Sequence, residues 1–223
     1  MKRARFIALS TQSNMPSRRQ NQLQRARELV LFAMLGSLMF CSKVIMEVLP
    51  NIHLLGMLTM TYTLVFRVKA LKPIYVYVFL NGLYAGFSTW WIPYLYIWTI
   101  LWGVTILLPK RMPKKLGYVI YPLVCGLHGI AFGALYAPAQ ALMFGLNFQQ
   151  MLLWIAAGLP FDLLHGLGNL AAGLLVIPLS DLLKKMINRQ YRRDFLRSAI
   201  RKPNDIPQIT DEKESFEHEK NEN

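Results

Sequence analysis

The sequence is poor in cysteine and in acidic residues, and each scarcity narrows the possible classes of protein. It holds 2 cysteines in 223 residues, and 12 Asp and Glu against 25 Lys and Arg. Cys41 and Cys125 lie within apolar stretches, and no CxxC pair or metal-ligand spacing exists. We therefore interpret both as small packing residues and expect neither a disulfide framework nor a metal site.

Two common enzyme motifs are also missing. No GxxxxGK[ST] loop occurs, so we expect no P-loop nucleotide site in this chain, and no HExxH zinc motif is present. We therefore expect no cofactor and no enzymatic activity of its own.

Apolar residues are abundant, and the basic residues are not scattered among them. Apolar types make up 54% of the chain and charged types 17%, which is too apolar for an ordinary soluble domain. Seven Lys and Arg precede Glu28, and most of the others cluster at 67–72, 110–115 and 184–202. The clusters alternate with connections that carry no basic residue, which is the positive-inside pattern. Charge placed at the ends of apolar runs indicates lipid headgroups rather than nucleic acid as its partner.

This pattern predicts an all-α, polytopic membrane protein with six transmembrane helices and both termini in the cytoplasm. A basic cytoplasmic segment (1–27) precedes the membrane domain (28–184), and a basic and then disordered tail (185–223) follows it. The connection 139–158 is expected to carry a short interfacial helix. The expected spans are 28–48, 53–66, 73–88, 91–108, 116–136 and 160–183.

Polar residues gather in the outer halves of these expected spans. Asp162, His165 and Asn169 recur at helical spacing in the sixth span, and an ionisable group inside a membrane indicates function. With them we expect a pocket open to the exterior, which suits an aromatic or heterocyclic polar solute. Its other expected lining residues are Asn51, His53, Asn81, Tyr84, Trp91, Tyr94, Trp98, His128 and Tyr136.

Structural interpretations of the same residues stay open. Trp90 and Tyr96 also fit an interfacial aromatic belt. Lys43 and Glu47, four residues apart, fit a structural ion pair as well as a ligand contact. Asp162 could instead hydrogen-bond between helices.

Small residues recur in the first expected helix. Ala33, Ser37 and Cys41 are four residues apart, with Gly36 beside them. Such a face allows close helix approach, either inside the bundle or against a partner membrane protein. We assign Ala33, Gly36 and Ser37 to a candidate partner interface.

Taken together, the chain resembles the substrate-binding membrane subunits, or S components, of energy-coupling-factor (ECF) ABC transporters. The resemblance covers roughly 28–185 and rests on chain length, six helices and the external polar pocket. The pattern Ala33-x-x-x-Ser37 is similar to the AxxxA contact motif of that family, with Ser in the second position. The runs 49–54, 91–96 and 158–162 resemble uncharacterised members and members that handle cobalamin-like solutes.

The resemblance implies a function in vitamin uptake at the plasma membrane of a bacterium. The chain would capture a vitamin or related micronutrient, with a cobalamin-like solute as the first expectation. It would deliver the solute through a scaffold membrane subunit and two ATPase subunits, which use the ATP. The alternatives are a stand-alone facilitator, an intramembrane enzyme using Asp162, His165 and His128, and an assembly protein.

Overall fold

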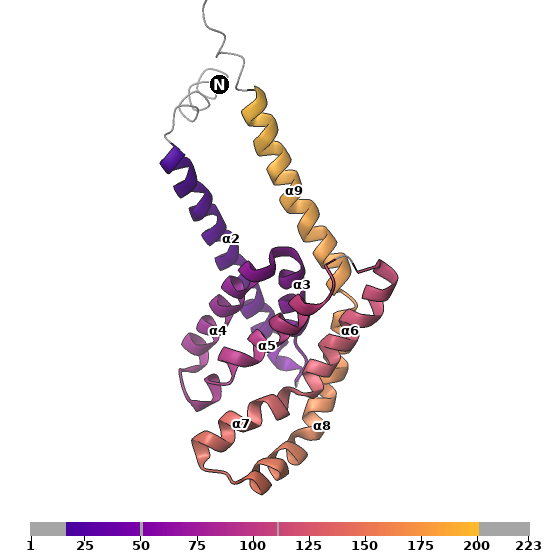
Figure 1. Ribbon diagram of the computed structural model, residues 1–223. Helices are drawn as coiled ribbons and strands as arrows, with labels where there is room; N and C mark the ends of the chain where they lie inside the picture. Colours follow the sequence, from indigo (N-terminus) through magenta and orange to yellow (C-terminus); the bar gives the residue numbers. More distant parts are fainter. Residues whose placement is uncertain (1–16, 50, 111, 201–223) are drawn as a thin grey trace, which may run out of the picture. The chain divides into compact units, whose positions relative to one another are not determined.

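The computed structural model describes residues 17–49, 51–110 and 112–200, and its regular structure over these residues is entirely helical (Figure 1). Residues 17–185 belong to one compact unit, which holds every contact discussed below. Of the second unit only 186–200, the continuation of the last helix, are described. The elements are α2 (Ser17–Ile45), the 3₁₀ turn η1 (Met46–Val48), α3 (Leu55–Phe66), η2 (Arg67–Ala70), α4 (Leu71–Ala85), η3 (Thr89–Trp91), α5 (Tyr94–Leu107), α6 (Lys114–Ile130), α7 (Phe132–Phe144), α8 (Phe148–Gly173) and α9 (Val176–Ile200).

Four helical stretches are long and apolar enough to cross a membrane: Gln22–Val48, Thr89–Leu107, Lys114–Phe144 and Phe148–Gly173. Helices α3 and α4 have 12 and 15 residues, fewer than the ~20 that a straight crossing of the hydrocarbon core needs. The all-helical expectation is thus confirmed for the described residues, and the helices are compatible with a membrane protein. The helix lengths alone support four spans, two fewer than the six that we expected.

The centre of the compact unit is α3. Residues Leu55 to Thr63 are all buried, on every side of the helix. The surrounding α2 instead exposes large apolar side chains such as Leu29, Met34 and Leu38. A buried central helix and apolar residues on the outer helices are the distribution expected where the surrounding medium is lipid rather than water.

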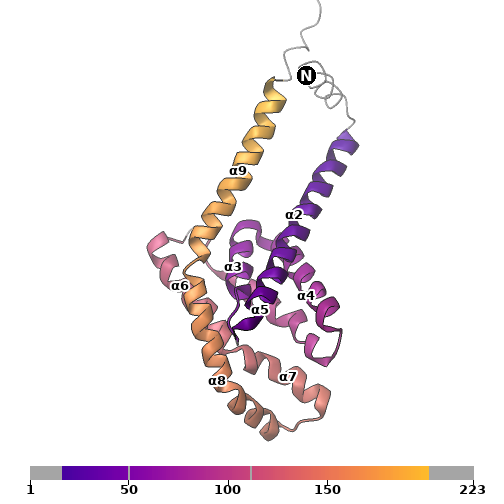
Figure 2. The ribbon, with the colours of Figure 1, turned by 180° about the vertical axis from the view of Figure 1, so that it is seen from behind.

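Helices α6 and α8 lie side by side through glycines (Figures 1 and 2). A Cβ added at Gly129 would lie 2.8 Å from the Cα of Gly166 and 2.8 Å from Nδ2 of Asn169. The two backbones therefore approach more closely than any side chain at position 129 would allow.

At the other side of the unit, α2 packs along α4 in the same way. A Cβ at Gly36 would lie 2.6 Å from Cβ of Val76 and 2.7 Å from the carbonyl oxygen of Pro73. Gly36 is therefore part of the internal α2–α4 contact.

The basic cluster that follows α3 is tied to neighbouring helices. Glu28 of α2 accepts hydrogen bonds from Lys69 (2.9 Å) and Lys72 (2.7 Å). The Arg67 guanidinium donates to the carbonyl oxygen of Ile106, near the end of α5, at 2.9 Å. These contacts bring the basic cluster 67–72 next to the N-terminal part of α2. The expected topology places both on the cytoplasmic side of the membrane.

The segment between α7 and α8 differs from the expectation of a long connection with an interfacial helix. Helix α7 continues past Pro138 to Phe144 and ends at Gly145, which has a left-handed backbone (φ 65°). Asn147 then starts α8 by a capping box, in which its side chain accepts the backbone N–H of Gln150 at 2.9 Å. Residues 149–154 are thus the first turns of α8, and the connection is a short turn.

The expected sixth span is also divided differently. Pro160, which we expected to open that span, lies inside α8. The helix then ends at Gly173, and α9 begins at Val176. A proline is tolerated within a membrane helix because neighbouring groups can satisfy the freed carbonyl, so it is a poor marker of a helix start there.

Candidate functional site

Two adjoining cavities lie among α2, η1, the loop before α3, η3, α5, α7 and α8. The larger has a volume of about 520 Å³ and the smaller about 270 Å³. Both are lined by Phe132, Phe161 and Asp162, so these three residues form a shared wall. We call them the aromatic cavity and the polar cavity, after the residues described next.

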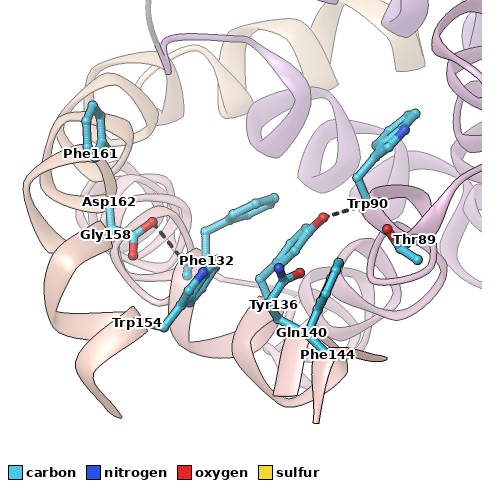
Figure 3. A pocket seen from close by; sticks show the side chains of 11 residues that line it. Thr89, Trp90, Phe132, Tyr136, Gln140, Phe144, Trp154, Gly158, Phe161 and Asp162 are labelled. Carbon is cyan, nitrogen blue, oxygen red and sulfur yellow. Dashed lines mark hydrogen bonds between the residues drawn. The ribbon is translucent and has the colours of Figure 1, made fainter. Parts of the chain in front are cut away.

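The aromatic cavity is walled by rings whose positions are fixed by contacts (Figure 3). The Tyr136 hydroxyl donates a hydrogen bond to the carbonyl oxygen of Trp90 at 2.8 Å. The Tyr136 and Trp154 rings are nearly parallel, with centroids 5.9 Å apart. Such a wall presents flat apolar faces, which suit a planar ring in a ligand. Its lining residues are Thr89, Trp90, Phe132, Gly133, Tyr136, Gln140, Phe144, Trp154, Gly158, Phe161 and Asp162.

Asp162 is held in place at the shared wall. One of its carboxylate oxygens accepts the backbone N–H of Gly133 at 3.1 Å (Figure 3). A Cβ at Gly133 would collide with the other oxygen, so only glycine leaves room for the carboxylate in this position. The side chain is 8% exposed, and among the described residues its charge has no ion-pair partner.

The polar cavity is lined by residues from the end of α2, the loop before α3, and α8. Lys43 and Glu47 form an ion pair there. The His53 and His165 rings meet edge to face, with centroids 4.5 Å apart. His53 Nδ1 and His165 Nε2 are buried and have no hydrogen-bond partner in the part of the chain that the structure describes. Leaving such a group unsatisfied costs roughly 1–3 kcal/mol, so these atoms favour a ligand that supplies the missing hydrogen bonds.

A layer of rings lies behind both cavities. Trp98 is 1% exposed and contacts the His53 and Phe132 rings at centroid distances of 6.0 Å each. His128 contacts Trp98 at 5.8 Å and hydrogen-bonds to the carbonyl oxygen of Ile97 at 3.2 Å. Trp98 and His128 therefore support the lining residues and do not line a cavity themselves.

The expected site residues thus fall into four groups. Six line a cavity: Asn51, His53, Tyr94, Tyr136, Asp162 and His165. Trp98 and His128 lie directly behind them, and Asn169 is buried where α3, α6 and α8 meet, close to Gly56 and Gly129.

The remaining three, Asn81, Tyr84 and Trp91, line neither cavity. Trp91 donates its indole N–H to the carbonyl oxygen of Val78 at 2.8 Å, which is a structural contact between η3 and α4. Tyr84 is exposed and packs edge-on against Phe40. Asn81 is buried with neither amide atom bonded, and nothing in the structure explains it.

Most of the aromatic wall is absent from the expected site. Trp154 belongs to the expected interfacial helix of the 139–158 connection, and for Trp90 the sequence leaves an aromatic belt open. A signal existed: Trp154, Gly158, Phe161, Asp162 and His165 recur at helical spacing on one face of α8. It is visible only if the helix is taken to continue through Pro160.

The candidate partner interface on α2 is divided between two faces. Ala33 and Ser37 are exposed, whereas Gly36 is buried against α4. The exposed small face that remains is therefore formed by Ala33 and Ser37, with Cys41 also exposed one turn further on.

Within the described part of the chain, no three His, Cys, Asp or Glu side chains are grouped so that they could hold a metal ion. No known protein family, curated protein or solved structure matches the chain. Fold and site together define an all-helical chain, compatible with a membrane protein, that carries a two-part cavity.

Proposed function

We propose that this chain is a membrane-embedded solute-binding subunit, the S component of an ECF-type ABC importer. It captures a vitamin or related micronutrient from outside the cell. It then delivers the solute by association with a scaffold membrane subunit and two ATPase subunits. The observation that carries the proposal is the two-part cavity, in which rings and unsatisfied buried polar atoms surround a space of ligand size.

The proposal includes six spans with both termini in the cytoplasm of a bacterial cell. Helices α3 and α4 would then be the two short spans. Helix α3 is enclosed by its neighbours over Leu55 to Thr63, so its length need not match the bilayer as a lipid-facing helix must. The Glu28 contacts with Lys69 and Lys72 support a common side for the first two basic clusters.

The exposed small face of α2 is the proposed contact with the scaffold subunit. Small residues allow two membrane helices to approach closely, and Ala33 and Ser37 point out of the compact unit. Helix α2 also exposes large apolar residues beside them, including Met34 and Leu38.

A thermal-shift screen of the purified full chain tests solute capture. The protein in detergent is screened against water-soluble vitamins and their precursors, corrinoids included, with no ATP present. A ligand that binds only the folded state stabilises it and so raises the melting temperature. At a free ligand concentration of a hundred times Kd, the free energy of unfolding rises by about 2.7 kcal/mol. We expect one compound class to give such a shift, and a screen in which every compound leaves the melting temperature unchanged contradicts the proposal.

A further inference from the structure

The two cavities differ in chemistry, and the residue at which they meet carries a charge. The aromatic cavity is walled mainly by rings, whereas the polar cavity holds Lys43, Glu47 and two imidazoles. Asp162 belongs to both. A ligand that fills both cavities must therefore lie next to the Asp162 carboxylate.

The charges around the two cavities do not balance. Their lining contains one basic residue, Lys43, and two acidic residues, Glu47 and Asp162. Lys43 is paired with Glu47, and neither His53 nor His165 forms an ion pair with Asp162 in the described chain. One buried negative charge is left over, and a buried charge without a partner is costly.

The nearest groups to Asp162 do not neutralise it either. The Gly133 N–H satisfies one oxygen, which holds the carboxylate in place without cancelling its charge. Phe132 and Phe161 form the rest of the shared wall. Neither ring carries a charge, so neither supplies a countercharge to the carboxylate.

We infer that the solute is a small aromatic monocation, an inference that rests on the proposed function. Its planar ring lies in the aromatic cavity, against Tyr136 and Trp154. Its protonated amine or quaternary nitrogen lies at Asp162. A polar substituent reaches His53 Nδ1 and His165 Nε2, which have no hydrogen-bond partner among the described residues. The cavity volumes fit a drug-sized ligand and favour a solute smaller than a corrinoid.

Matched probes test the charge requirement. Tryptamine and indole-3-propionate share an indole ring and a two-carbon chain but carry opposite charges, and 3-ethylindole is the neutral counterpart. Each is titrated at up to millimolar concentration into the full chain in lipid nanodiscs, with melting temperature and the heat of binding in isothermal titration calorimetry as readouts. We expect tryptamine to bind at least about tenfold more tightly than either counterpart, the difference that a charge-assisted contact supplies.

Two Asp-to-Asn variants locate the effect. Asp162→Asn keeps an oxygen that can accept the Gly133 N–H but removes the charge, so we expect tryptamine affinity to fall at least about tenfold. Asp181→Asn is the matched control, because Asp181 pairs with Lys114 and lines neither cavity. It should leave tryptamine affinity unchanged.

The outcomes separate this inference from the proposed function. Tighter binding of indole-3-propionate or 3-ethylindole, or tryptamine binding that survives Asp162→Asn, overturns the cationic solute while solute capture stands. So does a vitamin screen whose only hit is neutral or anionic. If neither the probes nor any compound of the screen binds, both the inference and the proposed function fall.

Discussion

Replacing Gly129 by alanine tests whether the close α6–α8 approach sets the position of the site. The added methyl group would lie 2.8 Å from Gly166 Cα, from Asn169 Nδ2 and from Cδ2 of His165. Ordinary van der Waals contact begins near 3.4 Å, so the helices must separate by about 0.6 Å. Because one of the three contacts is backbone, a side-chain rotation cannot relieve it.

The expected change in the stability of Gly129→Ala is the difference between two opposed effects. Overpacking of this kind costs typically ~1–3 kcal/mol, and alanine in place of glycine within a helix returns up to ~1 kcal/mol. Three contacts below 3.0 Å place the cost in the upper half of that range, at about 2–3 kcal/mol. The net loss of about 1–2 kcal/mol corresponds to a fall of about 2–8 °C in melting temperature for a chain of this size. Since His165 is one of the three contacts, ligand binding should weaken as well.

Gly103→Ala is the control for this measurement. It is also a helical glycine, in α5, but an added Cβ would meet nothing within 4 Å. We expect its melting temperature to equal or slightly exceed that of the parent chain. Both variants are heated in lipid nanodiscs, and melting is followed by loss of the folded peak in size-exclusion chromatography. A Gly129→Ala protein that melts with or above the parent would refute the packing argument.

Three further variants test other parts of the structure. Trp154→Ala removes one wall of the aromatic cavity, so solute affinity measured by fluorescence titration should fall about tenfold, and unchanged affinity would place the ring outside the site. Glu28→Gln should lower stability by no more than about 1 kcal/mol, because its partners Lys69 and Lys72 are largely exposed and the ion pairs are screened by water. Thermal melts at low and high salt check the electrostatic origin, since the difference from the parent chain should disappear at high salt. Ser37→Leu should leave folding and solute binding intact but abolish co-purification with the proposed scaffold subunit. Gly36→Leu should prevent folding itself, since Gly36 packs on Val76. Equal behaviour of the two variants would contradict the two-face description of α2.

Much of the helical framework could be predicted from hydropathy and basic clusters. The second, third and fourth expected segments agree with α3, α4 and α5 to within three residues, because the Arg67–Lys72 cluster and Pro109 lie where helices end. The first segment differs at its start, since α2 begins at Ser17 rather than at Glu28. The last part of the chain could not be divided correctly. There prolines lie inside helices, at Pro122, Pro138 and Pro160, where the neighbouring structure compensates for the lost hydrogen bond.

The site was predictable where polar residues recur along one helix and not where rings converge from several. Asp162 and His165 stand out in sequence because charged and imidazole groups are rare in apolar segments. Trp90, Phe132 and Phe144 do not, since aromatic residues are common throughout this chain and only the tertiary structure gathers these three around one cavity. Asn81 shows the converse: a buried polar residue that looks functional in sequence lies away from both cavities.

Native mass spectrometry of the full chain, released directly from lipid nanodiscs, tests solute capture most directly. The protein is measured as purified from its own membranes and again after incubation with the vitamin screen, without ATP or partner subunits. We predict a single added mass at one solute per chain, reduced in Asp162→Asn and retained in Asp181→Asn. A chain that appears only at its bare mass under all these conditions would contradict the account of this protein as a solute-binding subunit.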